Sequence, residues 1–594
     1  MSNNDYKFKV NLGGMIELLS GHLYSSPNVF VRELLQNCTD ANSARIIKDR
    51  NFDPKKAVVE IEVTGNEQIL FRDNGTGLTE EEIHEFLSVI GQSSKYDIEN
   101  GKAQGDFIGR FGIGLLSCFM VTDTIIVRTV SFKTPDRTLE WRGNSDGTYT
   151  ITELPDTMPV GTEIILQNNH SDADEMISGY YDPDEISNLV YYYGLFLKYP
   201  VYIISGNERT RLNLQINLDA DKNKPLCLKM GSMFLGDEFL DCFNLKSGDG
   251  LFSGIAYVLP HPVSANSHHM HRIYLKNMLL TENGDKLLPE WAFFIRCIIH
   301  TKKLTPTSSR EDFYEDELLE AAQEEIAQCI GEYFEHLELY NPAMLSEIVR
   351  IHHLAVKSVI AGNDNVSDVL LPYVVFQTSL GEMSAREIME FGTNASYTTD
   401  VNQFRQLAPL YSQRSELLIN AGYVYDSSII KKLAGKCKGT SIEMLTDSDI
   451  DLILDTSDME QEAQAFLNEA EKILRKYDCK AAARQFLPQD IPTLYSINTD
   501  AVNSRQIKRS KQQANDVFSD MLSSFESSFD STAKACLYFN TDNLVVKRLI
   551  SSPVTDKTKA CIEILYVNAL LSGHFPLLNN EMRTLNENLY TLML

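Results

Sequence analysis

Apolar and polar residues follow a helical period in residues 29–42, VFVRELLQNCTDAN. The period predicts an amphipathic helix with a wide apolar face, made of Val29, Phe30, Leu34, Leu35, Cys38 and Ala41. Glu33, Asn37 and Asp40 stand at i, i+4 and i+7, so they share one stripe of this helix. The stripe is either a solvated polar face or the wall of a pocket. In a pocket, a carboxylate and a carboxamide one turn apart would orient a water molecule and hold a hard cation through oxygen.

A strand and a glycine-containing turn are predicted in residues 67–83, EQILFRDNGTGLTEEEI. The apolar residues 69–71 predict the strand, and Thr79 with the acidic residues behind it predicts the start of a helix. Between them, Gly75 and Gly77 permit positive φ or the close approach of a flat ligand, while Asp73 offers a hydrogen-bond acceptor. Such clusters are usually simple turns, so other residues must join this one before it indicates a ligand site.

Three glycines, Gly109, Gly112 and Gly114, open the apolar segment FIGRFGIGLLSCF. Glycines at this spacing expose successive backbone N–H groups, and a helix N-terminus behind them would add partial positive charge, which suits phosphate. The G-x-x-G-x-G spacing is not that of a dinucleotide fold, because neither the preceding βαβ strand nor the acidic residue further on is present. The chain also lacks a G-x-x-x-x-G-K-[ST] segment, which excludes a P-loop.

Apolar stripes recur towards the C-terminus. One of them, at i, i+3, i+4, i+7 and i+11, consists of Phe518, Met521, Leu522, Phe525 and Phe529. This stripe either packs against its own domain or forms an exposed helix that contacts other proteins. Two narrower stripes are typical of helices that pair with other helices, and they consist of Ile562, Leu565, Ala569 and Leu570 and of Met582, Leu585, Leu589 and Leu592. They predict a two-fold homodimer with a helix bundle at its interface.

Composition and charge narrow the class of protein. A chain of 594 residues with 43% hydrophobic residues predicts a globular protein of several domains. The formal net charge of -28 argues against nucleic acid or an anionic membrane as the main partner. Ten scattered cysteines without a C-x-x-C pair favour a reducing compartment, and the N-terminus resembles no secretory signal, so we expect a cytoplasmic protein. For the histidines in SANSHHMHRIYL, a surface loop is favoured over a zinc site.

The order and spacing of these motifs resemble a known ATP-binding fold. A helical E-x-x-x-N-x-x-D, a D-x-G-x-G, a G-x-x-G-x-G and the Gly-Thr of PVGTEIIL occur together in the Bergerat fold of gyrase, Hsp90, histidine kinases and MutL. Within this group, NVFVRELLQNCTDAN, WRGNSDGTYTI and EISNLVYYYGLFLKYPVYI are similar to Hsp90 and its bacterial form HtpG. LPEW and the SRE of TSSRED resemble the middle domain of that family, and LYVNALLSGHFPLLNNEMRTLNENLYTLM resembles its dimerisation domain.

This resemblance implies ATP and Mg²⁺ as ligands, with a role for each matching residue. Glu33 would be the general base that orients the attacking water, and Asn37 would hold Mg²⁺. Asp73 would accept a hydrogen bond from the adenine amino group, joined through water by Thr162. The other ATP-binding residues would be Asp40, Ala41, Gly77, Leu78 and, around the phosphates, Gly109, Arg110, Phe111, Gly112, Ile113, Gly114 and Leu115. Arg310 would reach the γ-phosphate from a second domain, so hydrolysis should wait for domain docking.

The implied fold is α+β and multidomain. It comprises an N-terminal Bergerat-type α/β sandwich ATPase in residues 1–206, an α/β middle domain in 207–455 and a mostly helical α/β C-terminal dimerisation domain in 456–594. The implied function is that of an ATP-dependent chaperone with slow, Mg²⁺-dependent hydrolysis, a homodimeric clamp that remodels client proteins. Clients would contact the stripe formed by Phe518, Met521, Leu522 and Phe525.

Two alternative functions stay open at this point. A DNA-acting ATPase related to gyrase or MutL would share the ATP-binding motifs, although the acidic charge and the middle-domain segments count against it. A regulatory scaffold that binds ATP but hardly hydrolyses it is the second. This scaffold function is suggested by Gln92 and Phe86, which replace a lid lysine and an asparagine that are usual in the family. Arg110, which replaces a glutamine, is a further departure from the family pattern.

Overall fold

The computed structural model packs into two compact units, residues 1–333 and 334–594. It describes residues 26–65, 67–87, 96–97, 102–103, 114–168, 179–214, 216, 218–264, 270–284, 286–307, 311–362, 364–437, 441–445, 454–456, 460–497, 505–510 and 535–593. Both units combine sheets with helices, which confirms the mixed α/β architecture expected from the sequence. Among the helices described, none is both long and apolar enough to cross a membrane.

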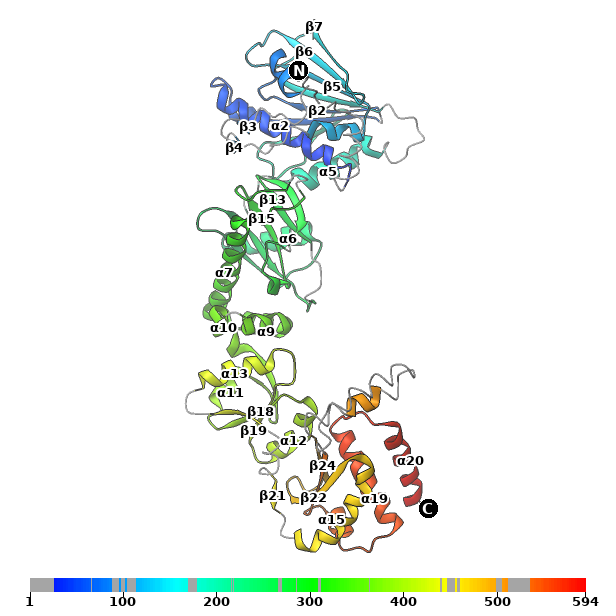
Figure 1. The fold of residues 1–594 in the computed structure, drawn as a ribbon. Helices are drawn as coiled ribbons and strands as arrows, with labels where there is room; N and C mark the ends of the chain where they lie inside the picture. The colour runs from blue at the N-terminus through cyan, green and yellow to red at the C-terminus, as the bar shows by residue number, and fades with distance from the viewer. Residues whose placement is uncertain are drawn as a thin grey trace, which may run out of the picture. The chain divides into compact units, whose positions relative to one another are not determined.

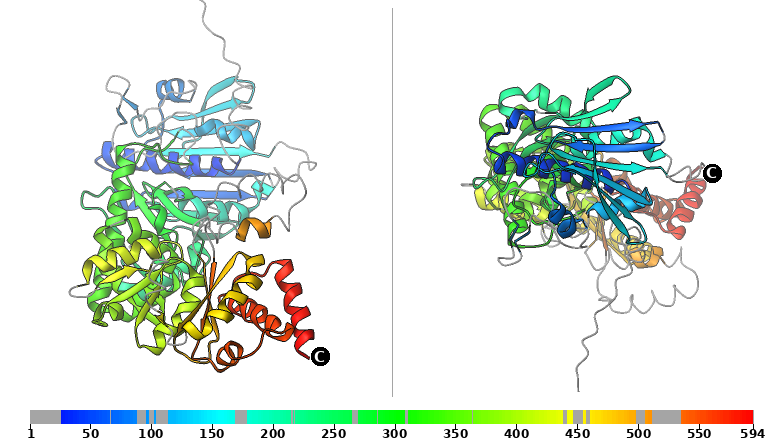
Figure 2. Two further views of the ribbon diagram at one scale, coloured as in Figure 1. Left: turned by 60° about the horizontal axis from the view of Figure 1, so that its bottom comes forward. Right: turned by 90° about the horizontal axis from the view of Figure 1, so that it is seen from above.

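The N-terminal part of the first unit is an eight-stranded sheet in the order β10-β9-β1-β2-β8-β5-β6-β7. Its strands are β1 (Val59–Thr64), β2 (Gln68–Asp73), β5 (Thr124–Val130), β6 (Thr138–Asn144), β7 (Tyr149–Leu154), β8 (Gly161–Gln167), β9 (Val201–Ser205) and β10 (Glu208–Arg211). Only β1 and β9 pair in parallel within this sheet as described. Helices α2 (Val29–Lys48) and α5 (Pro183–Gly194) lie along one face of it (Figures 1 and 2). The shorter elements are η2 (Pro54–Lys56), α3 (Glu80–Phe86), β3 (Tyr96–Asp97), β4 (Lys102–Ala103), η3 (Gly114–Met120) and η4 (Gly179–Tyr181).

Helix α2 forms the centre of the N-terminal core, as its apolar period predicts. Phe30, Leu34 and Leu35 are fully buried and belong to the same core as Ile61 and Phe71 of the sheet. Burying a side chain of this size contributes about 2 kcal/mol, so this face of α2 holds the layer together. The short α3 begins as predicted at Thr79, whose side chain and that of Glu82 form a reciprocal capping box.

The opposite face of the sheet carries a row of alternating charges. Glu60 pairs in register with Arg72, Arg72 with Glu163, Glu163 with Arg128, and Arg128 with Glu140. Arg72 Nε lies 2.7 Å from Glu163 Oε1, and Arg128 Nε lies 2.8 Å from Glu140 Oε2. Cross-strand pairs of opposite charge are favourable, whereas a slip of one residue would turn these charges towards the core. The row therefore helps to fix the register of five strands.

A five-stranded sheet, ordered β11-β12-β15-β13-β14, completes the first unit. Its strands are β11 (Asp241–Lys246), β12 (Phe252–Val258), β13 (Met270–Leu275), β14 (Met278–Asn283) and β15 (Ile295–Thr301), accompanied by α6 (Ala220–Leu235) and η5 (Glu290–Ala292). Between the two sheets, the buried Asn213 donates to the carbonyls of Leu197 and Tyr199 at 2.8 and 2.7 Å and accepts from the Val201 amide at 2.9 Å. Because these three hydrogen bonds go to backbone, Asn213 fixes the path of the chain where it leaves the first sheet.

Aromatic rings join the end of α5 to the second sheet. His300 of β15 stacks on Tyr274 with ring centroids 4.9 Å apart, and Phe196 packs its edge against His300 at the same distance. The rings shield the imidazole from water, and this burial lowers the pKa of His300 to about 4. His300 is therefore neutral at physiological pH and acts as an aromatic packing residue.

The second unit contains two smaller sheets and most of the helices after α7 (Glu317–Tyr340), which crosses the boundary between the units. The first sheet has the order β17-β16-β19-β18-β20, with β16 (Val375–Thr378), β17 (Gly381–Ser384), β18 (Ala395–Thr398), β19 (Leu417–Asn420) and β20 (Ile442–Met444). Around it lie α8 (Pro342–Ile351), α9 (His353–Gly362), α10 (Asp364–Leu370), η6 (Leu371–Tyr373), α11 (Ala385–Glu390), α12 (Val401–Gln413) and α13 (Asp426–Lys436).

The second sheet of this unit has the order β21-β22-β24-β23, with β21 (Asp455–Thr456), β22 (Cys479–Gln485), β23 (Thr493–Ser496) and β24 (Ala535–Asn540). Its helices are α15 (Glu460–Leu474), η7 (Arg475–Tyr477), α18 (Leu544–Ile550), α19 (Asp556–Ser572) and α20 (Asn579–Met593). Helices α19 and α20 lie side by side (Figure 2). The apolar stripe of Ile562, Leu565, Ala569 and Leu570, expected to pair with other helices, is buried in the core of this unit.

The two sheets of the second unit share one core. Phe404 and Leu407 of α12 are buried together with Leu494 of β23 and other residues of the C-terminal sheet. The buried Gln406 adds a polar link, because its Nε2 donates to the Ala569 carbonyl at 3.2 Å and its Oε1 accepts from the Tyr495 amide at 3.2 Å. Helix α12 is therefore packed against both sheets at once.

The low pKa of His300 makes the stability of the first unit depend on pH. The unfolded chain binds a proton near pH 6.5 whereas the folded chain does so near pH 4, so stability is complete above pH 6.5 and falls as pH falls towards 4. The loss at pH 4 should be about 3 kcal/mol. Thermal unfolding between pH 7 and 4, followed by calorimetry, should show a flatter profile for His300→Phe than for the wild type. The control is His261→Phe, because His261 is about half exposed; equal slopes for the two variants would contradict the assignment.

Candidate functional site

The polar stripe of α2 is buried and does not face solvent. Glu33 is 4% exposed and Asp40 is 1% exposed, while Asn37 between them is half-buried. The Glu33 carboxylate lies 3.4 Å from the guanidinium of Arg32, which is itself buried. Burying a carboxylate costs desolvation free energy unless the group is paired or hydrogen-bonded. A buried polar stripe of this kind therefore indicates a structural or chemical function. Of the two interpretations of the stripe, the solvated face does not describe this helix.

The D-x-G-x-G turn packs directly against α2. Asp73 is the buried last residue of β2, and its Oδ1 accepts from the Gly75 amide at 2.8 Å. A Cβ added at Gly75 would lie 2.5 Å from the Cβ of Ala41, so only glycine permits this approach. Gly77 has φ of +59°, and a Cβ there would lie 1.9 Å from the Val130 carbonyl oxygen. Both glycines are thus required by the packing, as the sequence motif indicates.

Thr162 lies beside the same turn. It pairs in register with Asp73 across β2 and β8. The hydroxyl of Thr162 lies 3.2 Å from that of the buried Thr129, which accepts from the Leu78 amide at 2.9 Å and donates to the Gly161 carbonyl at 3.1 Å. Thr129 therefore joins Thr162 to Leu78. Sequence reasoning missed this residue, because nothing but the pairing of β5 with β8 brings it to the site.

The last glycine of the G-x-x-G-x-G motif meets the carboxylate of α2. A Cβ added at Gly114 would lie 2.4 Å from Glu33 Oε2. Gly114 begins the 3-10 helix η3, a correction to the helix N-terminus expected behind the glycines, and Leu115 after it packs against the N-terminal core. Burial, followed by the charge of Glu33, raises the pKa of the Cys118 thiol in the same helix, so this cysteine stays protonated.

Several predicted site residues lie outside the described part of the chain. They are Gly109, Arg110, Phe111, Gly112, Ile113 and Arg310, together with Gln92 of the expected lid and the stripe of Phe518, Met521, Leu522 and Phe525. The chain on both sides of Arg310 is described, and it is paired: Pro306 forms a β-bridge with Phe313, and the Tyr314 amide donates to the Thr305 carbonyl at 3.0 Å. Phe86, the other departure from the family pattern, is the half-buried last residue of α3.

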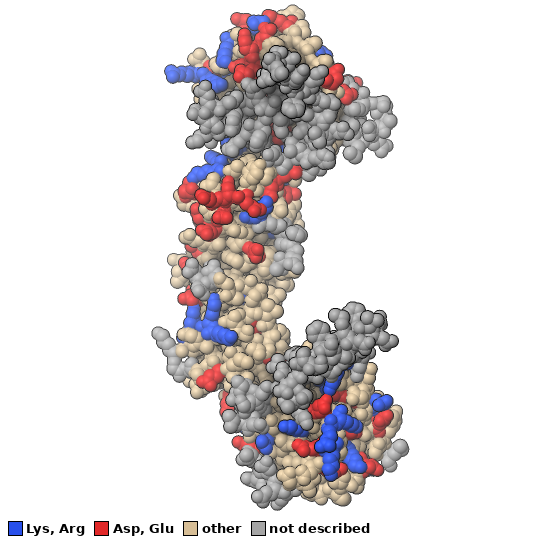
Figure 3. All heavy atoms as spheres, in the orientation of Figure 1, with Lys and Arg blue, Asp and Glu red and all other residues tan. Residues whose placement is uncertain are grey.

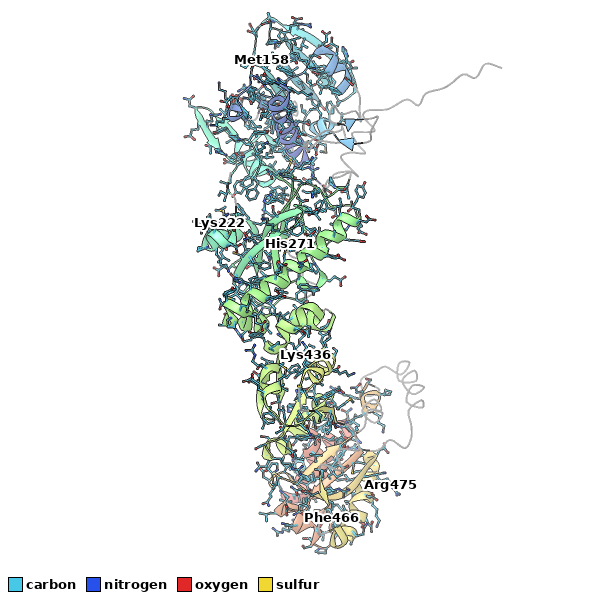
Figure 4. All side chains as sticks on the ribbon, turned by 90° about the vertical axis from the view of Figure 1, so that its left-hand side faces the viewer. Met158, Lys222, His271, Lys436, Phe466 and Arg475 are labelled. Carbon is cyan, nitrogen blue, oxygen red and sulfur yellow. The ribbon has the colours of Figure 1, made fainter. Side chains whose placement is uncertain are left out.

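The described residues contain no group of three or more His, Cys, Asp or Glu side chains that could hold a metal ion. His271 from the histidine cluster does not lie in a surface loop as expected. It is buried in β13 with Nδ1 3.3 Å from Cys297 Sγ (Figure 4). The other two histidines of that cluster lie outside the described residues.

The arrangement suits a flat, polar ligand with an anionic end. On one side of α2, a buried carboxylate acceptor, Asp73, stands among glycines whose added Cβ atoms would collide with their neighbours. About two helical turns away along α2, Glu33 meets Gly114 at the start of the second glycine segment. The donor and acceptor types fit a nucleotide with Mg²⁺: a carboxylate for a base amino group, an amide oxygen for the ion, and backbone N–H groups for phosphate.

The family comparison agrees with this arrangement. Residues 24–159 match the model of the histidine kinase-, DNA gyrase B- and HSP90-like ATPases. The matched residues contain α2, both glycine segments and most strands of the first sheet. The N-terminal part of the chain is therefore an ATPase domain of this class.

Curated relatives narrow the class to one family. The chain is 24% identical over 502 residues to the chaperone protein HtpG of Rickettsia canadensis, covering 78% of each protein. Its identity to HtpG of Rickettsia massiliae is 25% over 502 residues, again with 78% of each covered. HtpG of Chlorobium phaeobacteroides is 26% identical over 379 residues, or 58% of each. The chain is thus similar to HtpG chaperones over most of its length, which confirms the resemblance to the Hsp90/HtpG family seen in its motifs.

The contact between Gly114 and Glu33 can be tested by adding one methyl group. In Gly114→Ala the new Cβ would lie 2.4 Å from Glu33 Oε2, so the carboxylate must move. We expect ATP hydrolysis to slow about tenfold or more, because a displacement of about 1 Å is enough to disturb a reacting geometry. Steady-state hydrolysis measures this. Gly248→Ala, where a Cβ would have no neighbour within 4 Å, should leave the rate unchanged. Wild-type turnover in Gly114→Ala would refute the contact.

Proposed function

We propose that the chain is an ATP-dependent molecular chaperone of the Hsp90 type, which couples slow, Mg²⁺-dependent hydrolysis of ATP to the remodelling of client proteins. The observation that carries the proposal is that two glycine motifs meet on α2, where Gly75 approaches Ala41 and Gly114 approaches Glu33. The Gly-Thr motif joins the first of them, because Thr162 pairs in register with Asp73. The names of the relatives, all HtpG chaperones, support the choice of a chaperone over a DNA-acting enzyme.

In this proposal the nucleotide base lies against the β2 turn. Asp73 would accept a hydrogen bond from the adenine amino group, with Thr162 reaching the base through water. Gly77 and Leu78 would form the floor below the purine, and the amide of Leu78 is already committed to Thr129. Asp40 and Ala41 of α2 would line the same pocket. The buried state of Asp73 and Asp40 supports these roles, because a hydrogen bond to a buried carboxylate is worth more than one in water.

The phosphate end would lie near Glu33. Backbone N–H groups of Gly109, Arg110, Phe111, Gly112, Ile113, Gly114 and Leu115 would bind the phosphates. Asn37 would hold Mg²⁺ through its amide oxygen, and the ion supplies charge neutralisation when bound. Glu33 would orient the attacking water and take its proton. The ion pair with Arg32 at 3.4 Å would hold the Glu33 carboxylate in place between turnovers.

Arg310, which follows β15 in the chain, would stabilise the transition state by its charge. The neighbouring Glu311 is described: burial raises the pKa of Tyr193 on α5, the charge of Arg32 lowers it, and the charge of Glu311 raises it. We further propose domain limits of 1–206, 207–455 and 456–594.

A homodimer through α20 is the proposed quaternary structure. Of the four residues in its apolar stripe, Leu585 packs against the core of its own unit, whereas Met582, Leu589 and Leu592 are exposed. Exposed apolar residues in one stripe of a terminal helix are typical of an isologous helix interface. The client-contact role of Phe518, Met521, Leu522 and Phe525 stays a prediction.

Two substitutions separate binding from hydrolysis. Glu33→Ala should retain ATP affinity within about threefold and lower single-turnover hydrolysis by about a hundredfold or more, because the general base is lost. Asp73→Asn should weaken binding by about tenfold or more, measured by calorimetry, because the charged acceptor for the adenine amino group is lost. Glu33→Gln, which keeps the shape of the side chain, controls for loss of packing. Absence of ATP binding by the wild-type protein with Mg²⁺ would refute the proposed function.

The dimer interface can be tested at its exposed residues. Leu589 and Leu592 are 39% and 36% exposed, so Leu589→Glu with Leu592→Glu should leave the fold intact. The dimer should dissociate about a hundredfold more readily, because the charges would be buried at the interface. Analytical ultracentrifugation measures this. The control is Leu544→Glu with Val545→Glu on α18, where both residues are at least half exposed; an equal effect of the two pairs would contradict the interface.

A further inference from the structure

Five basic residues lie on the two segments that meet at the contact between Asp478 and Lys508 in the second unit, and we call them the basic face. Arg475 and Lys476 lie in η7, Lys480 is the second residue of β22, and Lys508 and Arg509 lie in the helical residues 505–510. Figure 3 shows Lys and Arg side chains gathered on the side of this unit that faces the viewer, and Figure 4 places Arg475 at its outer edge. The basic face thus draws on three elements that are separated in sequence.

The scaffold of the basic face is fixed by polar contacts. Lys508 Nζ lies 2.8 Å from Asp478 Oδ2, which joins residues 505–510 to the start of β22. Arg505, in the same short segment, forms a two-pronged ion pair with the buried Glu581 of α20, at 2.8 and 2.5 Å. The hydroxyl of Tyr566 also donates to Glu581, at 2.9 Å. Because a two-pronged ion pair to a buried carboxylate is costly to break, Arg505 anchors the short segment that carries Lys508 and Arg509.

The charges of the basic face are only partly balanced by acids. Lys476 pairs with Glu563 at 2.5 Å and Lys508 with Asp478. Arg475, Lys480 and Arg509 are exposed, and within the residues that the structure describes none of the three has an ion-pair partner. Like charges held close together repel one another, and the formal charge of the whole chain is -28. A local excess of cations on such a chain creates a positive potential that attracts an anionic partner.

We propose that the basic face is a docking surface for acidic segments of partner proteins. Guanidinium groups such as those of Arg475 and Arg509 bind carboxylates in a planar, two-pronged geometry, and Lys480 adds a mobile positive charge. A short acidic segment can reach a patch of this size, whereas a long nucleic acid would extend over surface that carries net negative charge. None of these residues belongs to the nucleotide site, so docking should not depend on ATP.

The test uses a fluorescein-labelled oligoglutamate and fluorescence anisotropy with the full chain at low salt. The patch variant carries Arg475→Glu, Lys480→Glu and Arg509→Glu. The matched control carries Arg548→Glu, Lys557→Glu and Lys431→Glu, which are also exposed residues of the second unit, so both variants change the formal charge equally. A third variant, Arg475→Gln with Lys480→Gln and Arg509→Gln, removes the charges without adding acids. A labelled single-stranded oligonucleotide of the same charge is the competing probe.

We expect the patch variant to weaken oligoglutamate binding by about tenfold or more, the glutamine variant to weaken it by a smaller factor, and the control to stay within about twofold. Higher salt should weaken wild-type binding and leave the patch variant almost unchanged. Equal losses in the patch and control variants would overturn the proposal, because only net charge would then matter. Tighter binding of the oligonucleotide, lost in the same patch variant, would overturn the choice of a protein segment. ATP hydrolysis should be unchanged in all three variants.

Discussion

The structure depends on one constraint, the burial of acidic side chains on the helix that also forms the hydrophobic core. Helix α2 must pack Phe30, Leu34 and Leu35 against the first sheet while keeping Glu33 and Asp40 away from water. Buried charge is tolerated when hydrogen bonds, opposite charges or backbone groups surround it. The glycine segments bring backbone groups close to the helix, because residues without a Cβ can approach Ala41 and Glu33. The hydrophobic core and the candidate site therefore both depend on the packing of α2.

The same helix is connected to the second sheet of the first unit through α5. Arg32 pairs with Glu33, and its charge also acts on Tyr193 of α5. The end of α5 continues into Phe196, whose ring packs against Tyr274 and His300 of the second sheet. A displacement of the second sheet would first change the packing of Phe196 at the end of α5. Its effect on the Glu33 carboxylate would have to pass along α5. These packed rings and charges connect the second sheet to α2 by direct contacts. The free energy of coupling between the two is a separate quantity, which mutant cycles measure.

Local patterns in the sequence predicted several helices and turns. The residues that strand pairing brings together could not be predicted in this way. The period of α2, the cap at Thr79 and the glycine turns follow from nearest neighbours along the chain, so they could be predicted. The link that Thr129 makes between Thr162 and Leu78 could not be predicted, because it depends on the pairing of β5 with β8. His271 was expected in a loop but lies in a buried strand, since its polar neighbours hid the apolar alternation that follows. Likewise, the stripe of α19 serves its own core, because periodicity shows a buried face without showing what covers it.

The shared core around Gln406 has a mechanical consequence. Its two hydrogen bonds join α12 to β23 and α19, and the apolar residues of α12 beside it are buried with residues of both sheets. Moving α19 away from the sheet that contains β19 would therefore break a buried hydrogen bond, and moving β23 away from α12 would expose apolar residues to water. These costs favour movement of the two layers together.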